Sequence, residues 1–196
     1  MNPLLPESVQ RRLVLASRSP RRRDILQRMQ FEFEIIPAAD HVENGASCKD
    51  PIERAEARAR LKAADVAARR PDAVVIGADT VVIVDGDVLD KPGDDEEAAR
   101  FLRRLSGREH IVATGVAVRR DVSGVDLSAC EETLVRFRSL TDAEVHSYVA
   151  SGEGRDKAGA YAVQGLGAAL VHSITGCFYN VVGLPVPCLF ELLRKV

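Results

Sequence analysis

A cluster of basic residues follows a serine–proline pair near the start of the chain, in the segment LASRSPRRRDIL at residues 15–26. Ser19 and Pro20 are typical of an N-cap and the first position of a helix, which places Arg21, Arg22 and Arg23 in the first helical turn. Cations are unfavourable at this positive end of the helix dipole. A bound anion would offset their repulsion, because the N–H groups at the helix start and the guanidinium groups both bind phosphate. The segment therefore predicts a phosphate site; the alternative is a solvated basic helix face.

A single carboxylate, Asp79, interrupts the apolar stretch VVIGADTVVIV at residues 74–84. A carboxylate in such a strand usually has a partner, a metal or a catalytic role; the alternative is an Asp at a bend beside Gly77, bonded to the backbone. If Asp85-Gly86 is a hairpin turn, Lys91 lies opposite Thr80, about 5 Å away across the strand pair. Lys91 next to Asp79 could neutralise phosphate charge, or it could form an ordinary surface salt bridge.

Two more polar residues stand in apolar surroundings. Lys62 lies in an alanine-rich helical segment and, taken alone, is most simply a solvated residue. Gln164 lies in YAVQG, within an expected apolar strand, where its amide could read the edge of a base or could bond to the backbone in the core. Glu43, in the polar loop 38–50, indicates little alone.

The elements that must position these residues alternate between strands and helices, which predicts the α/β class. We expect strands at 13–16, 31–36, 72–86, 87–89, 110–120, 131–140 and in the Gly-rich stretch 160–176. We expect helices from Pro20 and at 50–70, 94–107, 141–152 and 184–196. Asp50 is a candidate N-cap, and Thr141 with Glu144 matches a capping box. Residues 1–11 are expected to be a flexible extension.

Composition narrows the class of protein. Lys and Arg total 27 against 29 Asp and Glu, and only six Phe and three Tyr are present. A nucleic-acid-binding module would be basic with exposed aromatic residues, so no nucleic-acid partner is expected. The four cysteines form no C-x-x-C pair, which favours reduced thiols. Because neither an 18-residue apolar run nor a signal-peptide pattern occurs, we expect a cytoplasmic protein without a membrane partner.

Seven segments between residue 13 and about residue 186 together resemble the Maf (septum formation inhibitor-like) nucleotide pyrophosphatases. They are LASRSPRRRDIL, ARLKA, VIGADTVV, LDKPGDDEEAARFLRRLSGREH, TGVAV, DKAGAYAVQGLGAALV and NVVGLPV. The resemblance implies a single Maf-like domain over residues 1–196. Its fold would be a two-lobed, ITPase-like α/β structure around a mixed twisted sheet with flanking helices and a central nucleotide cleft.

The implied activity is hydrolysis of a nucleoside triphosphate between its α and β phosphates, giving a nucleoside monophosphate and pyrophosphate with a divalent cation, Mg²⁺ or Mn²⁺. By the resemblance, Arg21 and Arg22 match phosphate-binding arginines, Lys62 and Lys91 the two site lysines, Asp79 the general base, Ser17 a loop serine and Gln164 a glutamine on the base side. In one branch of the family, which resembles a 7-methyl-GTP hydrolase, an aromatic residue follows Ser-Pro and Glu replaces the glutamine. Arg21, Gln164 and Thr80 instead match the branch that acts on dTTP and UTP.

The chain departs from the family pattern in the loop AADHVENG, residues 38–45, where an Asp-Glu pair is common. Glu43 is the better match for that acidic metal ligand and Asp40 is the alternative, with Asp79 as the second ligand. A non-catalytic, nucleotide-binding regulator of septum formation is the alternative function; it would not need Asp79 and Lys91, and both are present. The substrate could also be a modified pyrimidine triphosphate, and the resemblance suggests a homodimer.

Overall fold

The computed structural model describes residues 2–196, which form two compact units. Unit 1 contains the chain up to Asp79 together with Thr114–Glu131 and Gly183–Val196, and unit 2 contains Thr80–Ala113 and Glu132–Val182. Each unit combines strands with helices, which confirms the α/β class and the flanking helices. Among residues 2–196 no helix is long and apolar enough to cross a membrane.

The sheet is mixed, as expected. Its strand order is β2-β1-β3-β5-β6-β7, and β4 pairs with β3. Strand β1 runs parallel to β2 and β3, whereas β4 is antiparallel to β3 and β7 is antiparallel to β6. The strands are β1 (Leu13–Leu15), β2 (Glu34–Ile35), β3 (Val74–Val84), β4 (Asp87–Leu89), β5 (Glu109–Arg120), β6 (Val125–Phe137) and β7 (Val171–Thr175).

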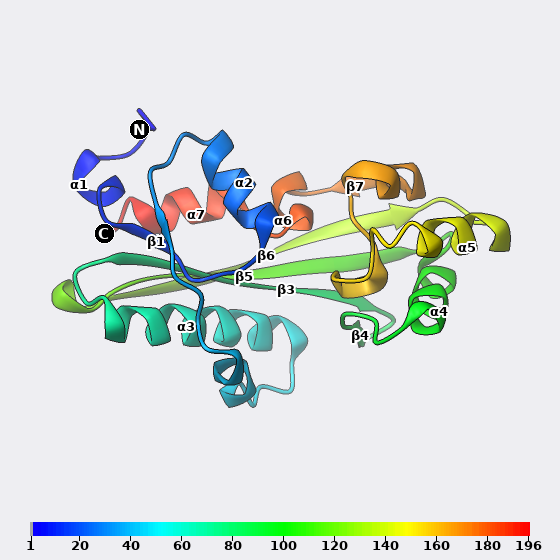
Figure 1. The fold of residues 1–196 in the computed structure, drawn as a ribbon, viewed down its shortest axis with the longest axis horizontal. Coiled ribbons are helices and arrows are strands. Elements are labelled where there is room, and N and C mark those ends of the chain that lie inside the picture. The colour runs from blue at the N-terminus through cyan, green and yellow to red at the C-terminus, as the bar shows by residue number, and fades with distance from the viewer. Residues whose placement is uncertain (1) are drawn as a thin grey trace. The chain divides into compact units, whose positions relative to one another are not determined.

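In unit 1, helices cover both faces of the strands. Helix α3 (Pro51–Arg69) lies on one face, and α2 (Pro20–Arg28) and α7 (Val186–Leu193) lie on the other (Figure 1). Both expected caps are present, since Ser19 accepts from the Arg22 N–H and Asp50 accepts from the N–H groups of Ile52 and Glu53. The polar loop contains a 3₁₀ helix, Asp40–Gly45.

Helix α3 approaches the sheet very closely. Its buried face is a row of alanines one turn apart, Ala55, Ala59 and Ala63. Opposite them lie Gly77 of β3 and Gly115 of β5, where an added Cβ would collide with the helix backbone. Because small residues face each other across this contact, α3 lies close enough to the sheet for its longer side chains to reach residues of β3.

The start of the chain differs from the flexible extension that was expected. Residues 7–10 form α1 (Glu7–Gln10), and Leu5, Val9 and Gln10 are buried. The Asn2 side chain donates to the Met29 carbonyl at 2.7 Å, and Gln10 donates to the carbonyls of Asn2 and Leu5. Residues 2–11 are therefore packed against the chain near the end of α2, and Met1 lies outside the described residues.

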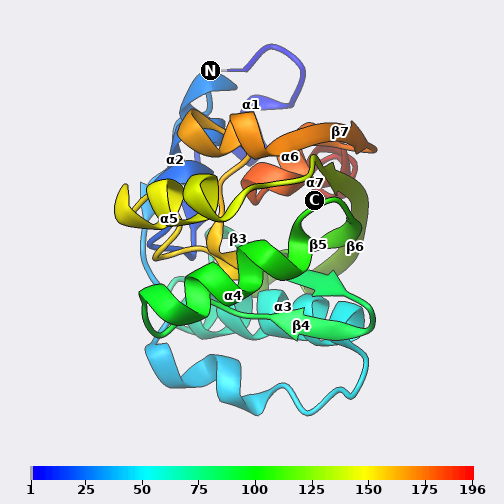
Figure 2. The same ribbon diagram turned by 90° about the vertical axis from the view of Figure 1, so that its right-hand side faces the viewer.

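In unit 2, α4 (Asp95–Leu105) and α5 (Asp142–Ala150) lie side by side (Figure 2). The Thr141–Glu144 capping box is present at the start of α5. A buried cluster that includes Leu102, Phe137 and Tyr148 forms the core of this unit. Unit 2 also contains the short helix α6 (Phe178–Val182) and the 3₁₀ turns Ala158–Ala160 and Gly165–Leu170. Unit 1 contains a further 3₁₀ turn, Asp121–Ser123.

Three strand predictions were only partly right. In the segment 31–36 only Glu34–Ile35 is a strand, and in 160–176 only Val171–Thr175 is one, because 3₁₀ turns occupy most of the earlier part. Strand β6 begins at Val125, before the expected start. The hairpin prediction is confirmed: Asp85 and Gly86 both have positive φ, and Val82 pairs with Leu89. The ladder ends at that pair, however, so Lys91 follows β4 rather than belonging to it.

Candidate functional site

The ammonium group of Lys62 joins two carboxylates in unit 1. Its Nζ lies 2.6 Å from Oδ1 of Asp79 and 2.9 Å from Oε1 of Glu43, and it also approaches the Ala78 carbonyl at 3.4 Å. Lys62 and Asp79 are both buried, at 8% exposure each. The interpretation of Lys62 as a solvated residue is therefore wrong. Lys62 lies beside the alanine row of α3. Because this helix packs closely against β3, the ammonium group of Lys62 reaches Asp79.

The structure distinguishes the two acidic candidates in the 3₁₀ helix Asp40–Gly45. Glu43 contacts Lys62, whereas Asp40 is exposed and pairs with Arg18 at 2.5 Å. Of the two, Glu43 is thus the one that the fold brings to Asp79. Among residues 2–196 no group of three or more His, Cys, Asp or Glu side chains is arranged to hold a metal ion. Two carboxylates at one point still suit Mg²⁺, which proteins commonly bind through one or two carboxylates together with substrate phosphates.

Arg22 is buried at the start of α2 and binds protein acceptors. Its guanidinium donates to the carbonyls of Gly183 and Ala78, each at 2.8 Å, and to Oγ of Ser17 at 3.2 Å. Burial lowers the pKa of Arg22, while the negative charge of Asp79 acts in the opposite direction. These contacts connect the start of α2 to the loop after β1, to β3 and to the segment before α7.

The other two arginines of the cluster differ from Arg22. Arg21 is partly buried in the first turn of α2. Arg23 is exposed and pairs with its neighbour Asp24 at 3.0 Å, which fits a solvated helix residue. A phosphate contact by Arg21 and Arg22 stays a prediction.

Three predicted residues lie in unit 2. Thr80 is partly buried in β3, and Lys91 is exposed in the segment between β4 and α4. Gln164 was expected to lie in a strand, and this prediction is wrong. It precedes the 3₁₀ turn Gly165–Leu170 and is partly buried. Glycines with backbone freedom, such as Gly165 at φ +66°, favour a turn here over an extended strand.

The segment after Gln164 is held by a carboxylate that the sequence analysis missed. Glu153 accepts from the N–H groups of Leu166 at 2.9 Å and Gly167 at 2.8 Å, and from the Tyr148 hydroxyl at 2.9 Å. Desolvation raises the pKa of Glu153, but these hydrogen bonds outweigh it, so the pKa is lowered. The partners are mostly backbone groups, which no residue pattern reveals.

A second missed residue, Arg58, approaches Asp79 from α3. Its Nη1 lies 3.7 Å from Oδ2 of Asp79. The available signal was spacing, because Arg58 precedes Lys62 by four residues and thus lies on the same face of the helix.

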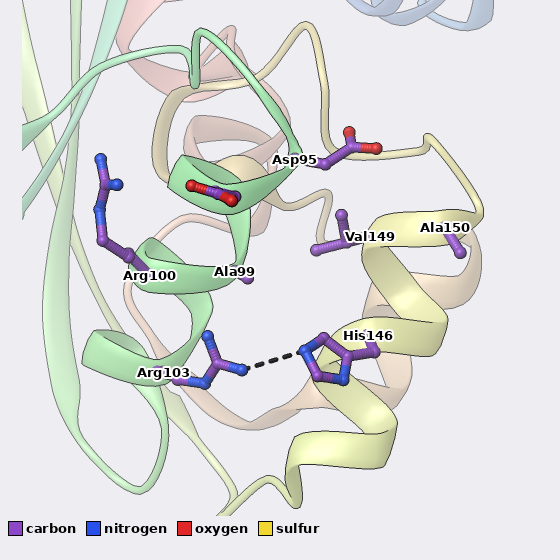
Figure 3. Close-up of a pocket in the computed structure, with 8 residues that line it drawn as sticks. Asp95, Ala99, Arg100, Arg103, His146, Val149 and Ala150 are labelled. Atoms are coloured by element: carbon purple, nitrogen blue, oxygen red, sulfur yellow. Dashed lines mark hydrogen bonds between the residues drawn. The ribbon is translucent and has the colours of Figure 1, made fainter.

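A hollow of about 500 Å³ lies between α4 and α5 in unit 2 (Figure 3). Ala99, Val149 and Ala150 are its apolar lining, and Arg103 at one end bonds to His146 at 3.1 Å and to Asp142 at 2.7 Å. The hollow contains none of the residues predicted to do chemistry. We therefore place the candidate site around Asp79 and not here.

Comparison with known proteins identifies a family model and relatives that match nearly the whole chain. The family model described as "Maf-like protein" matches residues 12–196. A protein named "dTTP/UTP pyrophosphatase" from Pelotomaculum thermopropionicum is 50% identical over 93% of this chain and 95% of its own length. One of the same name from Carboxydothermus hydrogenoformans is 48% identical over 94% of this chain and 98% of its own length. A HAM1 protein from Coxiella burnetii covers 64% of this chain and 72% of its own at 16% identity, with a TM-score of 0.39.

Proposed function

Because this chain belongs to the family of Maf-like proteins, we propose that it is a nucleoside triphosphate pyrophosphatase that hydrolyses dTTP and UTP to the monophosphate and pyrophosphate. Relatives named dTTP/UTP pyrophosphatase, 39–50% identical over nearly the whole chain, support this substrate class. A modified pyrimidine triphosphate would offer the same phosphates. The observation that carries the proposal is the convergence of Lys62, Asp79 and Glu43 in unit 1.

Asp79 is the proposed general base. It accepts a proton from a water molecule, whose oxygen then bonds to the α-phosphorus while the bond from that phosphorus to the bridging oxygen breaks. Pyrophosphate leaves with the bridging oxygen. A carboxylate in a nearly dry position suits this role, because water competes less for its charge there.

The cations of the site neutralise the phosphates. Lys62 is buried and already binds two carboxylates, so its position is fixed before substrate arrives. Arg21 and Arg22 are proposed to bind phosphate oxygens at the start of α2, assisted by the N–H groups of the first turn and by Ser17. Removing one such contact should raise the activation free energy of hydrolysis by about 2–4 kcal/mol, as the loss of one oxyanion-hole donor does in other enzymes.

Glu43 and Asp79 are the proposed ligands of a divalent cation, Mg²⁺ or Mn²⁺, together with substrate oxygens. When bound, such a cation supplies positive charge to the phosphates and to the leaving pyrophosphate. The protein itself contributes the carboxylates of Glu43 and Asp79, which both contact the ammonium group of Lys62.

The residues of unit 2 take their proposed roles from the family. Lys91 is proposed as the second catalytic lysine, Gln164 as the residue that reads the pyrimidine edge, and Thr80 as a substrate contact. A cytoplasmic homodimer without nucleic-acid or membrane partners completes the proposal.

A panel of nucleoside triphosphates with Mg²⁺, scored for pyrophosphate against orthophosphate, tests the function. We expect pyrophosphate release from dTTP and UTP and little from ATP or GTP; release of orthophosphate alone would reject α–β cleavage. Asp79→Asn should bind dTTP yet turn it over at least about 100-fold more slowly. Turnover by Asp79→Asn at the parent rate would reject Asp79 as the base.

A further inference from the structure

Two cations of α3 divide the carboxylate of Asp79 between them. Lys62 takes Oδ1 in a short, charge-assisted hydrogen bond of 2.6 Å, and Arg58 faces Oδ2 at 3.7 Å. The second distance is too long for a hydrogen bond. Arg58 is thus held near Asp79 by charge, without the directional contact that fixes Lys62.

Arg58 and Arg22 use their hydrogen-bonding capacity differently. Arg22 donates to three protein acceptors and is anchored by them. Nε of Arg58 is buried without a hydrogen-bond partner, although the side chain as a whole is 26% exposed. A guanidinium has five N–H donors in a planar fork that matches phosphate oxygens. Nη1 of Arg58 therefore lies near the proposed base, and Nε of the same guanidinium lacks a hydrogen-bond acceptor.

We propose that Arg58 is a further substrate-binding residue, which leaves Oδ2 of Asp79 and binds an oxygen of the triphosphate chain when substrate arrives. This inference rests on the proposed function. Little is lost in the move, because the contact with Asp79 is only an ion pair at 3.7 Å, and hydrogen bonds to a charged phosphate are gained. The same move frees Oδ2, the oxygen that Lys62 does not bind, to accept the proton of the attacking water.

Arg58→Met tests the proposal, because methionine removes the charge and keeps an apolar stem. The matched control is Arg60→Met on the same helix, since Arg60 is exposed and pairs with Asp126 at 2.8 Å. We expect Arg58→Met to raise KM for dTTP about tenfold or more. The inhibition constant of inorganic pyrophosphate should rise by a similar factor, whereas Arg60→Met should leave both constants within about twofold. Arg58→Lys, which keeps a charge without the fork, should fall between them.

A lower kcat with unchanged KM and unchanged pyrophosphate inhibition would overturn the proposal, because Arg58 would then only position Asp79. Equal effects of Arg58→Met and Arg60→Met would also overturn it. If Arg58→Met does not fold, as judged by circular dichroism, Arg58→Lys and calorimetric titration with dTTP decide the question by the same criterion. If the wild-type protein releases no pyrophosphate but binds dTTP, the proposed function fails and the titration still tests Arg58; if it binds no triphosphate, both fail.

Discussion

His110 makes the stability of the protein depend on pH in a way that the structure allows us to calculate. The residue lies near the start of β5 at 2% exposure, and its Nε2 lies 2.7 Å from the Tyr161 hydroxyl. Phe137 and Tyr161 pack against its ring edge-to-face, at centroid distances of 5.2 and 5.4 Å. Nδ1 is buried without a partner, so no acceptor is available for a second proton. Desolvation by this burial lowers the pKa of His110 from 6.5 to about 4.

Whether a lower pH stabilises or destabilises the folded protein depends on which state, folded or unfolded, binds the proton. Below pH 6.5 the unfolded chain protonates at this position and the folded chain does not, so protonation favours unfolding until the pH reaches about 4. From these two pKa values, the free energy of unfolding falls by about 2 kcal/mol between pH 7 and pH 5, and by about 3 kcal/mol below pH 4.

Urea unfolding at pH 7, 6 and 5 measures this loss. We compare the wild type with His110→Gln, which cannot titrate, and with His172→Gln, which makes the same substitution at an exposed histidine. His110→Gln should be less stable at pH 7 because it loses ring packing, but its decline between pH 7 and pH 5 should be about 2 kcal/mol smaller than that of the wild type. His172→Gln should keep the wild-type decline. If His110→Gln declines as steeply as the wild type, His110 is already protonated or exposed in the folded state and the reasoning is refuted.

Two further predictions concern the packing of α3 and the capping of α5. Gly77→Ala places a Cβ against the Ala59 carbonyl and the Ala63 N–H of α3, so we expect a loss of about 1–3 kcal/mol in urea unfolding and lower dTTP turnover. Gly93→Ala meets only a Glu97 oxygen at 3.4 Å and should change stability by less than about 0.5 kcal/mol; equal effects at both glycines would contradict the close seat of α3. Thr141→Ala removes the side-chain cap of α5 and should cost about 1 kcal/mol. The pKa of Glu144, lowered to about 2 mainly by its hydrogen bond to Arg138 and further by Thr141, should rise only slightly in a carboxyl titration followed by NMR, because Arg138 and the backbone N–H at position 141 remain. An unchanged melting temperature would mean that the cap contributes nothing.

Local sequence patterns correctly predicted the helices and strands that begin or end at a capping residue or a characteristic turn residue. Ser19, Asp50 and Thr141 cap helices where expected, because a side-chain oxygen at such a position satisfies an N–H group within the same turn. The Asp85-Gly86 turn fixed the register of β3 and β4 for a similar reason, since the positive φ values belong to those two residues. The stretch 160–176 failed because its apolar residues fit a strand and a series of turns equally well, and contacts made by the distant Glu153 hold the turn after Gln164.

The candidate site was predictable by residue type but not by contact. Lys62 and Asp79 are separated by 17 positions, and they meet because three alanines of α3 fit against glycines of two strands. No helical period in the sequence shows which strand a helix will cover, so Lys62 resembled any solvated lysine. The family resemblance placed it in the site, and the alanine–glycine contact supplies the physical reason.

The arginine cluster at the start of α2 divides by the acceptors that each residue finds. The basic pattern alone did not predict that Arg22 is buried and donates to the backbone carbonyls of Gly183 and Ala78. Backbone acceptors are the same for every residue type, and therefore leave no trace in the sequence. A buried guanidinium is stable here because Nε and Nη1 donate to protein acceptors and the negative charge of Asp79 partly offsets its desolvation. The charge that looked unfavourable at a helix start thus holds α2 to the strand that carries the proposed base.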